Sequence, residues 1–219
     1  MQGMRKLIIY DRIYISMITE NSLRTLYIEE KLSMMEISAI LKCSHNQVVY
    51  WMHKYEIDRR SISDAIYQQQ NPNGDPFKIK HIGTIQDAEL LGMGLGLYWG
   101  EGTKRNKSSI RLGNTDAGII KTFIEFLTEI CGIDTNKLRY SLQIFSDVIP
   151  QDALNYWMKE LNVDKLKFTK VIITPARSIG TYRNKNMNGV LTVNFHNRKL
   201  RDIIVGMCRD SSVGRAQQW

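Results

Sequence analysis

Residues 94–106, GLGLYWGEGTKRN, combine four glycines with a single carboxylate, Glu101, and two basic residues, Lys104 and Arg105. Glycines beside basic residues are typical of phosphate-binding loops, so we compared the spacing with two such patterns. A dinucleotide fingerprint needs G-x-G-x-x-G after a strand, but Trp99 stands where the third glycine belongs. A Walker loop needs Gly-Lys-Ser/Thr, whereas the order here is Gly-Thr-Lys. The spacing excludes both kinds of nucleotide site.

Helical geometry accounts for the glycines better. Gly92, Gly96 and Gly100 recur every four residues, which places them along one side of a helix. Each costs roughly 0.5–1 kcal/mol relative to alanine, so a compensating contact is expected. A second helix can approach such a side closely and gain dispersion energy there. One such partner is a second copy of the chain, which would bring Glu101 beside the axis between the copies.

Charge points to a polyanionic partner. The 219 residues carry a formal net charge of +8, and residues 165–201 contain nine Lys or Arg and no Asp or Glu. A solvated surface normally mixes both signs. We therefore expect this stretch to contact phosphates, the alternative being an ordinary exposed face.

Residues 32–57 predict two short helices joined by a tight turn, after an earlier helix capped by Thr19 or Asn21. Ser33 and Glu36 have capping-box spacing at the start of the first helix, and Ser44 caps the second. The pattern resembles a helix-turn-helix, whose second helix enters the DNA major groove; the alternative is a plain three-helix packing unit. The candidate DNA contacts are Ser44, Asn46, Gln47, Tyr50 and Lys54 on the second helix, with Arg59 and Arg60 suited to phosphates.

A cluster of Gln, Asn, Pro and Gly predicts a linker over residues 68–80. Beyond it the patterns predict helix, strand, helix, strand, helix, strand, strand, helix. Strands with one apolar and one polar or basic face indicate an α+β fold, with helices on one face of a curved, mainly antiparallel sheet. The candidate DNA contacts here are Arg105, Arg111, Arg139, Gln143, Lys167, Lys170, Arg177, Arg183 and Lys185. The expected divisions are 1–67 (N-terminal arm and helix-turn-helix), 68–80 (linker), 81–208 (second domain) and 209–219 (disordered tail).

Residues 96–102, GLYWGEG, resemble the GLIDADG part of the motif of the LAGLIDADG homing endonucleases, with Leu95 in the preceding position. The resemblance continues through the later strands and helices and covers residues 85–208. It implies that two motif helices pack across a dyad, or across a pseudo-dyad within one chain, and that the last acid of each binds a divalent metal at the scissile phosphates. It also implies that concave antiparallel sheets read the major groove. Because one motif is visible, a homodimer on a roughly palindromic double-stranded DNA target is implied.

Carried over onto this chain, the resemblance makes Glu101 the catalytic ligand of Mg²⁺ or Mn²⁺, with Gly100 as the second candidate residue of the metal site. Lys104 is a second candidate catalytic residue, expected to steady the phosphates together with Arg105. The Lys found near active sites of the family is sought in residues 165–185 without an assignment. The dimer interface is assigned to Gly92, Gly96, Leu97 and Gly100. The chain departs from the motif at Trp99, which replaces its first acid, and at Glu101, which replaces Asp and lengthens the arm.

The resemblance and the helix-turn-helix pattern are compatible with two functions. The first is a site-specific, metal-dependent DNA endonuclease. The second is a non-cleaving transcriptional regulator with a relic domain, as in bacterial sporulation regulators that join such a domain to a helix-turn-helix. Those regulators tend to lack the acid, so Glu101 favours the nuclease. A site-specific recombinase would need a serine or tyrosine nucleophile constellation, which we do not find.

Other features narrow the class of protein. No apolar run is long enough for a membrane span, and the start lacks the order of a secretory signal, so we expect a cytoplasmic protein, or an organellar one in a eukaryote. Neither a membrane nor a small-molecule cofactor is expected as a partner.

The cysteines and histidines give no sign of a metal site. No CxxC pair is formed by the three cysteines, which are expected to be buried free thiols: Cys43, Cys131 and Cys208. The scattered histidines give no metal pattern, and His196 is expected to face DNA or solvent.

The tail raises a separate hypothesis. Residues 210–216, DSSVGRA, back-translate as GAU AGC UCA GUC GGU AGA GCN, which looks like the 5′ part and D-arm of a tRNA gene. The alternative is an ordinary polar tail.

Overall fold

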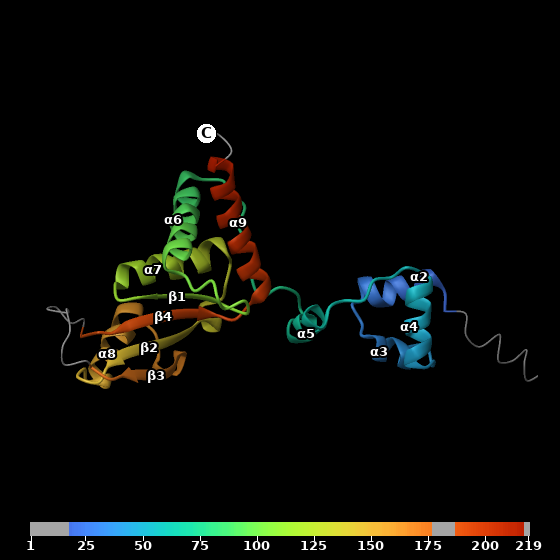
Figure 1. Cartoon of the computed structure of the whole chain (residues 1–219), viewed down its shortest axis with the longest axis horizontal. Helices are drawn as coiled ribbons and strands as arrows, with labels where there is room; N and C mark the ends of the chain where they lie inside the picture. Colours follow the sequence, from blue (N-terminus) through green and yellow to red (C-terminus); the bar gives the residue numbers. More distant parts are fainter. Residues whose placement is uncertain (1–17, 177–186, 217–219) are drawn as a thin grey trace, which may run out of the picture. The chain divides into compact units, whose positions relative to one another are not determined.

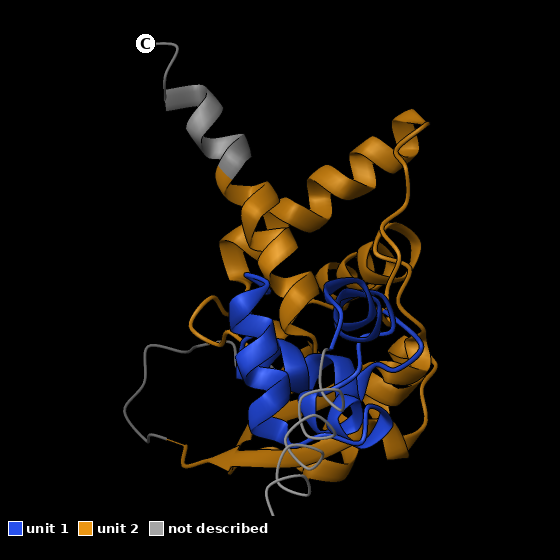
Figure 2. Cartoon of the chain, turned by 90° about the vertical axis from the view of Figure 1, so that its right-hand side faces the viewer, with its two compact units in different colours: residues 1–74 blue, residues 75–219 orange. Residues whose placement is uncertain are grey.

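The computed structural model describes residues 18–176 and 187–216, with side chains described as far as Arg209. The chain divides into two compact units, Met1–Gly74 and Asp75–Trp219, and the division falls inside the predicted linker. Figure 1 shows the elements and Figure 2 shows the two units in different colours. Each unit has a hydrophobic core of its own.

The first unit is helical. It contains α2 (Glu20–Arg24), continued by one π-helical turn, η1 (Thr25–Glu29), and then α3 (Met34–Ile40), α4 (His45–Lys54) and α5 (Ile62–Gln70). Thr19 caps α2, and complete capping boxes start α3 at Ser33 and α4 at Ser44, as predicted. Lys42, at φ 49°, lies in the tight turn between α3 and α4. Leu23, Ile37 and Val48 are fully buried between the helices.

The second unit contains the predicted series of elements. They are α6 (Ile85–Glu101), β1 (Ile110–Asn114), α7 (Ala117–Glu125) continued by a π-helical turn η2 (Phe126–Ile130), the short 3-10 turn η3 (Thr135–Lys137), β2 (Arg139–Phe145), α8 (Pro150–Leu161), a second 3-10 turn η4 (Lys165–Lys167), β3 (Phe168–Thr174), β4 (Val190–Phe195) and α9 (Arg198–Ala216). Asp116 caps α7 and Pro150 starts α8, and both were expected. Gly132, expected to close the long helix, has φ 63° just beyond η2.

The four strands form one sheet in the order β1-β4-β2-β3. β4 pairs antiparallel with both β1 and β2, whereas β2 and β3 are parallel. The α+β class is therefore confirmed, but the sheet is mixed. Helix α8 lies between β2 and β3 in the sequence, and such a helical crossover allows two consecutive strands to run in the same direction.

One face of the sheet is covered by helices. Its apolar side chains, among them Leu112, Leu142 and Val193, are buried with those of the helices in a single core. α6 packs on β1, α7 and α9, while α8 packs on β2 and α7. Figure 1 shows α6 and α9 rising next to each other from the β1 side of the sheet. The opposite face carries exposed and half-buried side chains, and among the described residues no helix covers it; we call it the open face.

Helix α9 runs to Ala216 and so enters the stretch expected to be a disordered tail. Its buried core residues, as far as side chains are described, are Leu200, Ile204, Val205 and Cys208. The three cysteines are free; Cys131 and Cys208 are buried, and burial raises the pKa of Cys131 to about 12, so that thiol is unreactive. None of the described helices has the length and apolar character needed to cross a membrane.

Candidate nucleic-acid interface

The glycines of α6 belong to two different sides of the helix. Gly94 is buried, and a Cβ there would lie 2.1 Å from the Phe126 ring, so this glycine allows α6 to approach η2. Gly92, Gly96 and Gly100 are exposed, and a Cβ on any of them would meet nothing within 4 Å. The predicted glycine seam therefore lies on an open side of α6. Leu97, assigned to the same interface, instead packs against the core of its own unit.

The end of α6 is attached to the edge strand of the sheet. Gly102 forms an isolated bridge with Leu112, and the Thr103 N–H donates to the Arg111 carbonyl over 2.9 Å. Gly102 is buried, and a Cβ there would lie 2.4 Å from both the Tyr98 ring and the Tyr98 carbonyl oxygen. Only glycine fits this contact. The chain thus leaves α6 directly alongside β1, which brings residues 101–105 to the sheet edge.

Glu101 is exposed at the last position of α6 and makes no hydrogen bond or ion pair with any other described residue. The neighbouring Gly100 carbonyl lies in the last turn, where carbonyls lack partners within the helix. Together they offer two hard oxygen donors, which suit Mg²⁺ or Mn²⁺. Within the described ranges, no three His, Cys, Asp or Glu side chains gather as a metal cluster. A divalent ion held by these two oxygens would need water, phosphate or a second carboxylate to complete its ligand set.

Lys104 folds back over the end of α6. Its ammonium group donates to the Trp99 carbonyl oxygen and lies 5.3 Å from the centre of the Trp99 ring. The carbonyl of Lys104 accepts a hydrogen bond of 2.7 Å from Arg201 of α9. Lys104 therefore neutralises the negative end of the helix dipole next to Glu101. Sequence reasoning missed Arg201, because it lies 97 residues away from the loop that it holds.

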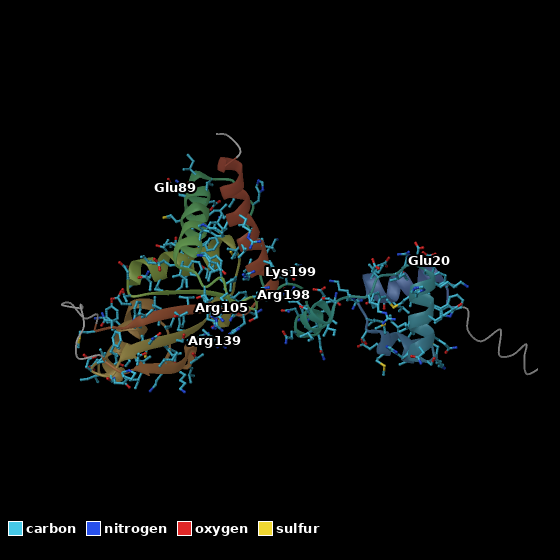
Figure 3. The ribbon with its side chains drawn as sticks, in the orientation of Figure 1. Glu20, Glu89, Arg105, Arg139, Arg198 and Lys199 are labelled. Atoms are coloured by element: carbon cyan, nitrogen blue, oxygen red, sulfur yellow. The ribbon has the colours of Figure 1, made fainter. Side chains whose placement is uncertain are left out.

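The open face of the sheet carries a basic row across three strands. Arg111 of β1 and Arg139 of β2 both pair with Asn194 of β4. The next row contains Gly113, Thr192 and Ser141, and the third contains Val190, Gln143 and Ile172. None of these residues is acidic. Figure 3 shows the side chains, with Arg139 and Arg105 labelled. We call the first of these rows, Arg111, Asn194 and Arg139, the basic row.

Neutral acceptors hold several of these cations. Arg111 Nε donates to the Ser109 hydroxyl over 2.9 Å. Arg139 and Lys167 both donate to the Asn136 carbonyl, over 2.7 and 3.0 Å. Because these acceptors are uncharged, they position the guanidinium and ammonium groups without cancelling their charge. The basic row and Lys167 can therefore attract phosphates.

The remaining predicted residues of this surface are less constrained. Gln143 donates to the Thr174 hydroxyl over 3.1 Å, while Lys170 and Arg105 are exposed. Arg177, Arg183 and Lys185 lie outside the described residues. Asn194 was not selected as a DNA contact from the sequence, and only the cross-strand register places it between Arg111 and Arg139. His196, expected to face DNA or solvent, follows β4 and is hydrogen-bonded to Asn194.

In the first unit, one side of α4 is polar and exposed. It presents Asn46, Gln47, Tyr50 and Lys54, while Val48 and Met52 are buried. The Ser44 hydroxyl accepts from the Gln47 N–H, and the Gln47 side-chain carbonyl accepts from the Ser44 N–H. Ser44 is thus occupied with capping, while Gln47 retains its outward NH₂ group.

Arg59 and Arg60 differ in their surroundings. Arg59 is exposed. The Arg60 guanidinium stacks over the Tyr27 ring, 4.0 Å from its centre, and donates to the carbonyls of Tyr27, Lys31 and Leu32 and to Gln68. Arg60, predicted to contact phosphate, is therefore engaged in joining the segments of its own unit. Lys54 lies 4.6 Å from the Trp51 ring centre and keeps its charge on the outer side of α4.

Comparison with protein-family models, curated proteins and solved structures found no match to this chain.

Proposed function

We propose that this protein is a site-specific DNA endonuclease of the homing type, which acts as a homodimer on double-stranded DNA. The observation that carries the proposal is the attachment of Glu101 to the basic sheet face. The exposed carboxylate lies two residues before Thr103, whose N–H binds the Arg111 carbonyl, and Arg111 belongs to the basic row. Duplex bound on that face would bring a phosphate toward the end of α6.

The residues at this end match the needs of phosphodiester hydrolysis. A divalent ion held by Glu101 and the Gly100 carbonyl would supply positive charge for the pentacoordinate transition state and lower the pKa of a bound water. Arg111 would hold the phosphate by charge-assisted hydrogen bonds. Arg201 holds the loop that carries Lys104, so the distance between the carboxylate and the sheet varies little.

Dimerisation supplies what one chain lacks. Each chain brings one carboxylate at this position, whereas cutting both strands needs a centre at each scissile phosphate. The open side of α6 suits close contact with an identical helix, because its three glycines leave the backbone uncovered. A two-fold axis along that side would place the two Glu101 residues close together and the two basic rows on one duplex.

The first unit would add affinity and sequence preference. The outer side of α4 presents amide, phenol and ammonium groups, which can contact base edges and phosphates in a major groove. We propose that α3 and α4 act as a helix-turn-helix and that Arg59 contacts phosphate.

The deciding experiment uses purified full-length chain and DNA from its own locus with Mg²⁺ or Mn²⁺. The unaltered protein should cut or nick this DNA. Glu101→Gln should bind with similar affinity and fail to cut, since the amide is of the same size but a poor ligand. Glu125→Gln, which changes an exposed acid of α7 in the same way, should cut normally. Equal loss in both variants would contradict the assignment of Glu101.

The runner-up function is a non-cleaving transcriptional regulator. Two observations favour it: no metal cluster of three acidic, His or Cys side chains forms within the described residues, and the Lys104 ammonium is occupied by the Trp99 carbonyl. Tight, site-specific binding without cleavage, across a library of sites and several divalent metals, would establish the regulator and remove the nuclease.

A further inference from the structure

Asn194 and His196 form a hydrogen-bonded pair on the open face of the sheet. Asn194 is the middle residue of the basic row, and its Nδ2 lies 2.8 Å from Nε2 of His196. An amide NH₂ group only donates, so Nε2 must accept and the ring proton must lie on Nδ1. This hydrogen bond belongs to the neutral form of His196.

The other end of the Asn194 amide has no partner. Its Oδ1 is buried and accepts no hydrogen bond from the described residues. A protonated His196 would carry a second proton on Nε2, and rotation of the Asn194 amide would direct Oδ1 toward it. The pair can therefore keep a hydrogen bond in both protonation states of His196.

The charges around the ring oppose protonation in the free protein. Partial burial of the ring, and then the charge of Arg111 on β1, lower the pKa of His196. Arg139 on β2 lies opposite Asn194, and Arg198 at the start of α9 is paired with Asp202 at 3.5 Å. A phosphate anion bound among these cations would offset their repulsion and favour the charged imidazole.

We propose that His196 is a phosphate contact of the DNA interface and binds in its protonated form, so that association with DNA takes up a proton. The proposal rests on the proposed DNA binding, but not on cleavage. The Asn194 amide turns as the proton is bound, and Oδ1 then accepts from Nε2. Arg111 of β1 and His196, which directly follows β4, hold the same phosphate.

DNA should bind more tightly at low pH, because binding of DNA raises the pKa of His196 from its lowered value in the free protein. Affinity should therefore be constant at high pH, rise as the pH falls through the pKa of the complex, and level off below the pKa of the free protein. The total gain should be about tenfold for each unit by which DNA raises that pKa.

The test measures the dissociation constant of the full-length chain for a mixed-sequence duplex from about pH 5.5 to 8.5, at constant ionic strength and without divalent metal. The wild-type profile should show this rise. His196→Gln, which keeps hydrogen-bonding atoms but does not titrate, should stay at the low-affinity level throughout. His81→Gln, at an exposed position of the same unit, should reproduce the wild-type profile.

A second measurement follows the His196 imidazole by NMR, free and with duplex, where its pKa should rise on binding. The salt dependence should also be steeper at low pH, by about 0.9 in the log–log slope for one added phosphate contact. A pH profile that His196→Gln retains, or an imidazole that stays neutral in the complex at the low-pH plateau, would overturn the inference while DNA binding stands. Absence of duplex binding at every pH would instead remove the proposed function.

Discussion

The main-chain N–H of Thr103 donates to the carbonyl oxygen of Arg111 over 2.9 Å, and this bond joins the end of α6 to the edge of the sheet. It links the only carboxylate of the glycine-rich stretch to the first arginine of the basic row through backbone atoms. Because backbone hydrogen bonds vary less in position than long side chains, the distance between Glu101 and the basic row is set by the fold itself.

Gly102→Ala should break this attachment. The new Cβ would overlap the Tyr98 ring and carbonyl, and the second unit should lose about 1–3 kcal/mol of stability. Urea unfolding followed by tryptophan fluorescence measures the change. Gly83→Ala, where a Cβ meets nothing within 4 Å, is the matched control and should unfold like the wild type. A fully stable Gly102→Ala protein would show that the loop can leave the sheet freely.

Gly94→Ala and Gly96→Ala should have opposite effects, although only Leu95 lies between them. The first drives a methyl group into the Phe126 ring and should destabilise the unit by about 1–3 kcal/mol. The second has open space and should stabilise the helix by roughly 0.5–1 kcal/mol, yet weaken self-association. Unfolding curves and sedimentation equilibrium report the two quantities. A Gly96→Ala protein that dimerises as tightly as wild type would place the dimer contact elsewhere.

Arg60→Ala should unfold the first unit more easily, by about 2 kcal/mol or more, because carbonyls of three residues lose a charged donor and Tyr27 loses its cation. Arg59→Ala should leave the thermal midpoint unchanged and lower DNA affinity. Differential scanning calorimetry and binding titrations separate the two effects. If Arg60→Ala lowered affinity at unchanged stability, its guanidinium would have to reach DNA after all.

Arg139→Ala should weaken DNA binding and reduce the slope of log affinity against log salt by about 0.9, the value for one phosphate contact. Lys159→Ala on α8, an exposed cation on the helix-covered side, should change neither quantity. Titrations at several salt concentrations give both numbers. An unchanged slope together with altered base preference would assign Arg139 to a base edge, and no change at all would exclude the basic row.

The codons of residues 210–216 should read GAU AGC UCA GUC GGU AGA GCN if the coding region overlaps a tRNA gene. Sequencing the gene decides this directly, since serine alone has six alternative codons at each of two positions. Removal of the residues after Arg209 should leave the melting temperature unchanged, because the described core residues of α9 end at Cys208. Unrelated codons would leave DSSVGRA as an ordinary polar segment.

Local signals in the sequence predicted local structure well. Ser33 with Glu36, Ser44, Asp116 and Pro150 start their helices as expected, because a cap depends on residues within one turn. The α+β class and the order of elements followed from apolar periodicity, which reports how each segment buries one side.

Contacts between distant residues could not be predicted. The parallel pairing of β2 with β3 depends on where the strands meet, which periodicity does not encode. Arg60 appears exposed and basic in sequence, yet its partner Tyr27 lies 33 residues away. The four-residue spacing places Gly96 on another side of the helix from Gly94, but it does not reveal that Gly94 packs against Phe126 while Gly96 lies in open space.

The sheet order also governs when the second unit can form. β4 is the last of the four strands in the chain, yet it lies between β1 and β2 and supplies the middle residue of the basic row. During synthesis, β1 and β2 cannot join into one sheet until residues 190–195, which form the strand between them, have left the ribosome. The first unit is compact by itself and has its own core, so it can fold well before that. A nascent chain would therefore carry a finished α4 surface long before it carried a complete sheet, and under the proposed function its first contact with DNA would be made by the N-terminal unit alone.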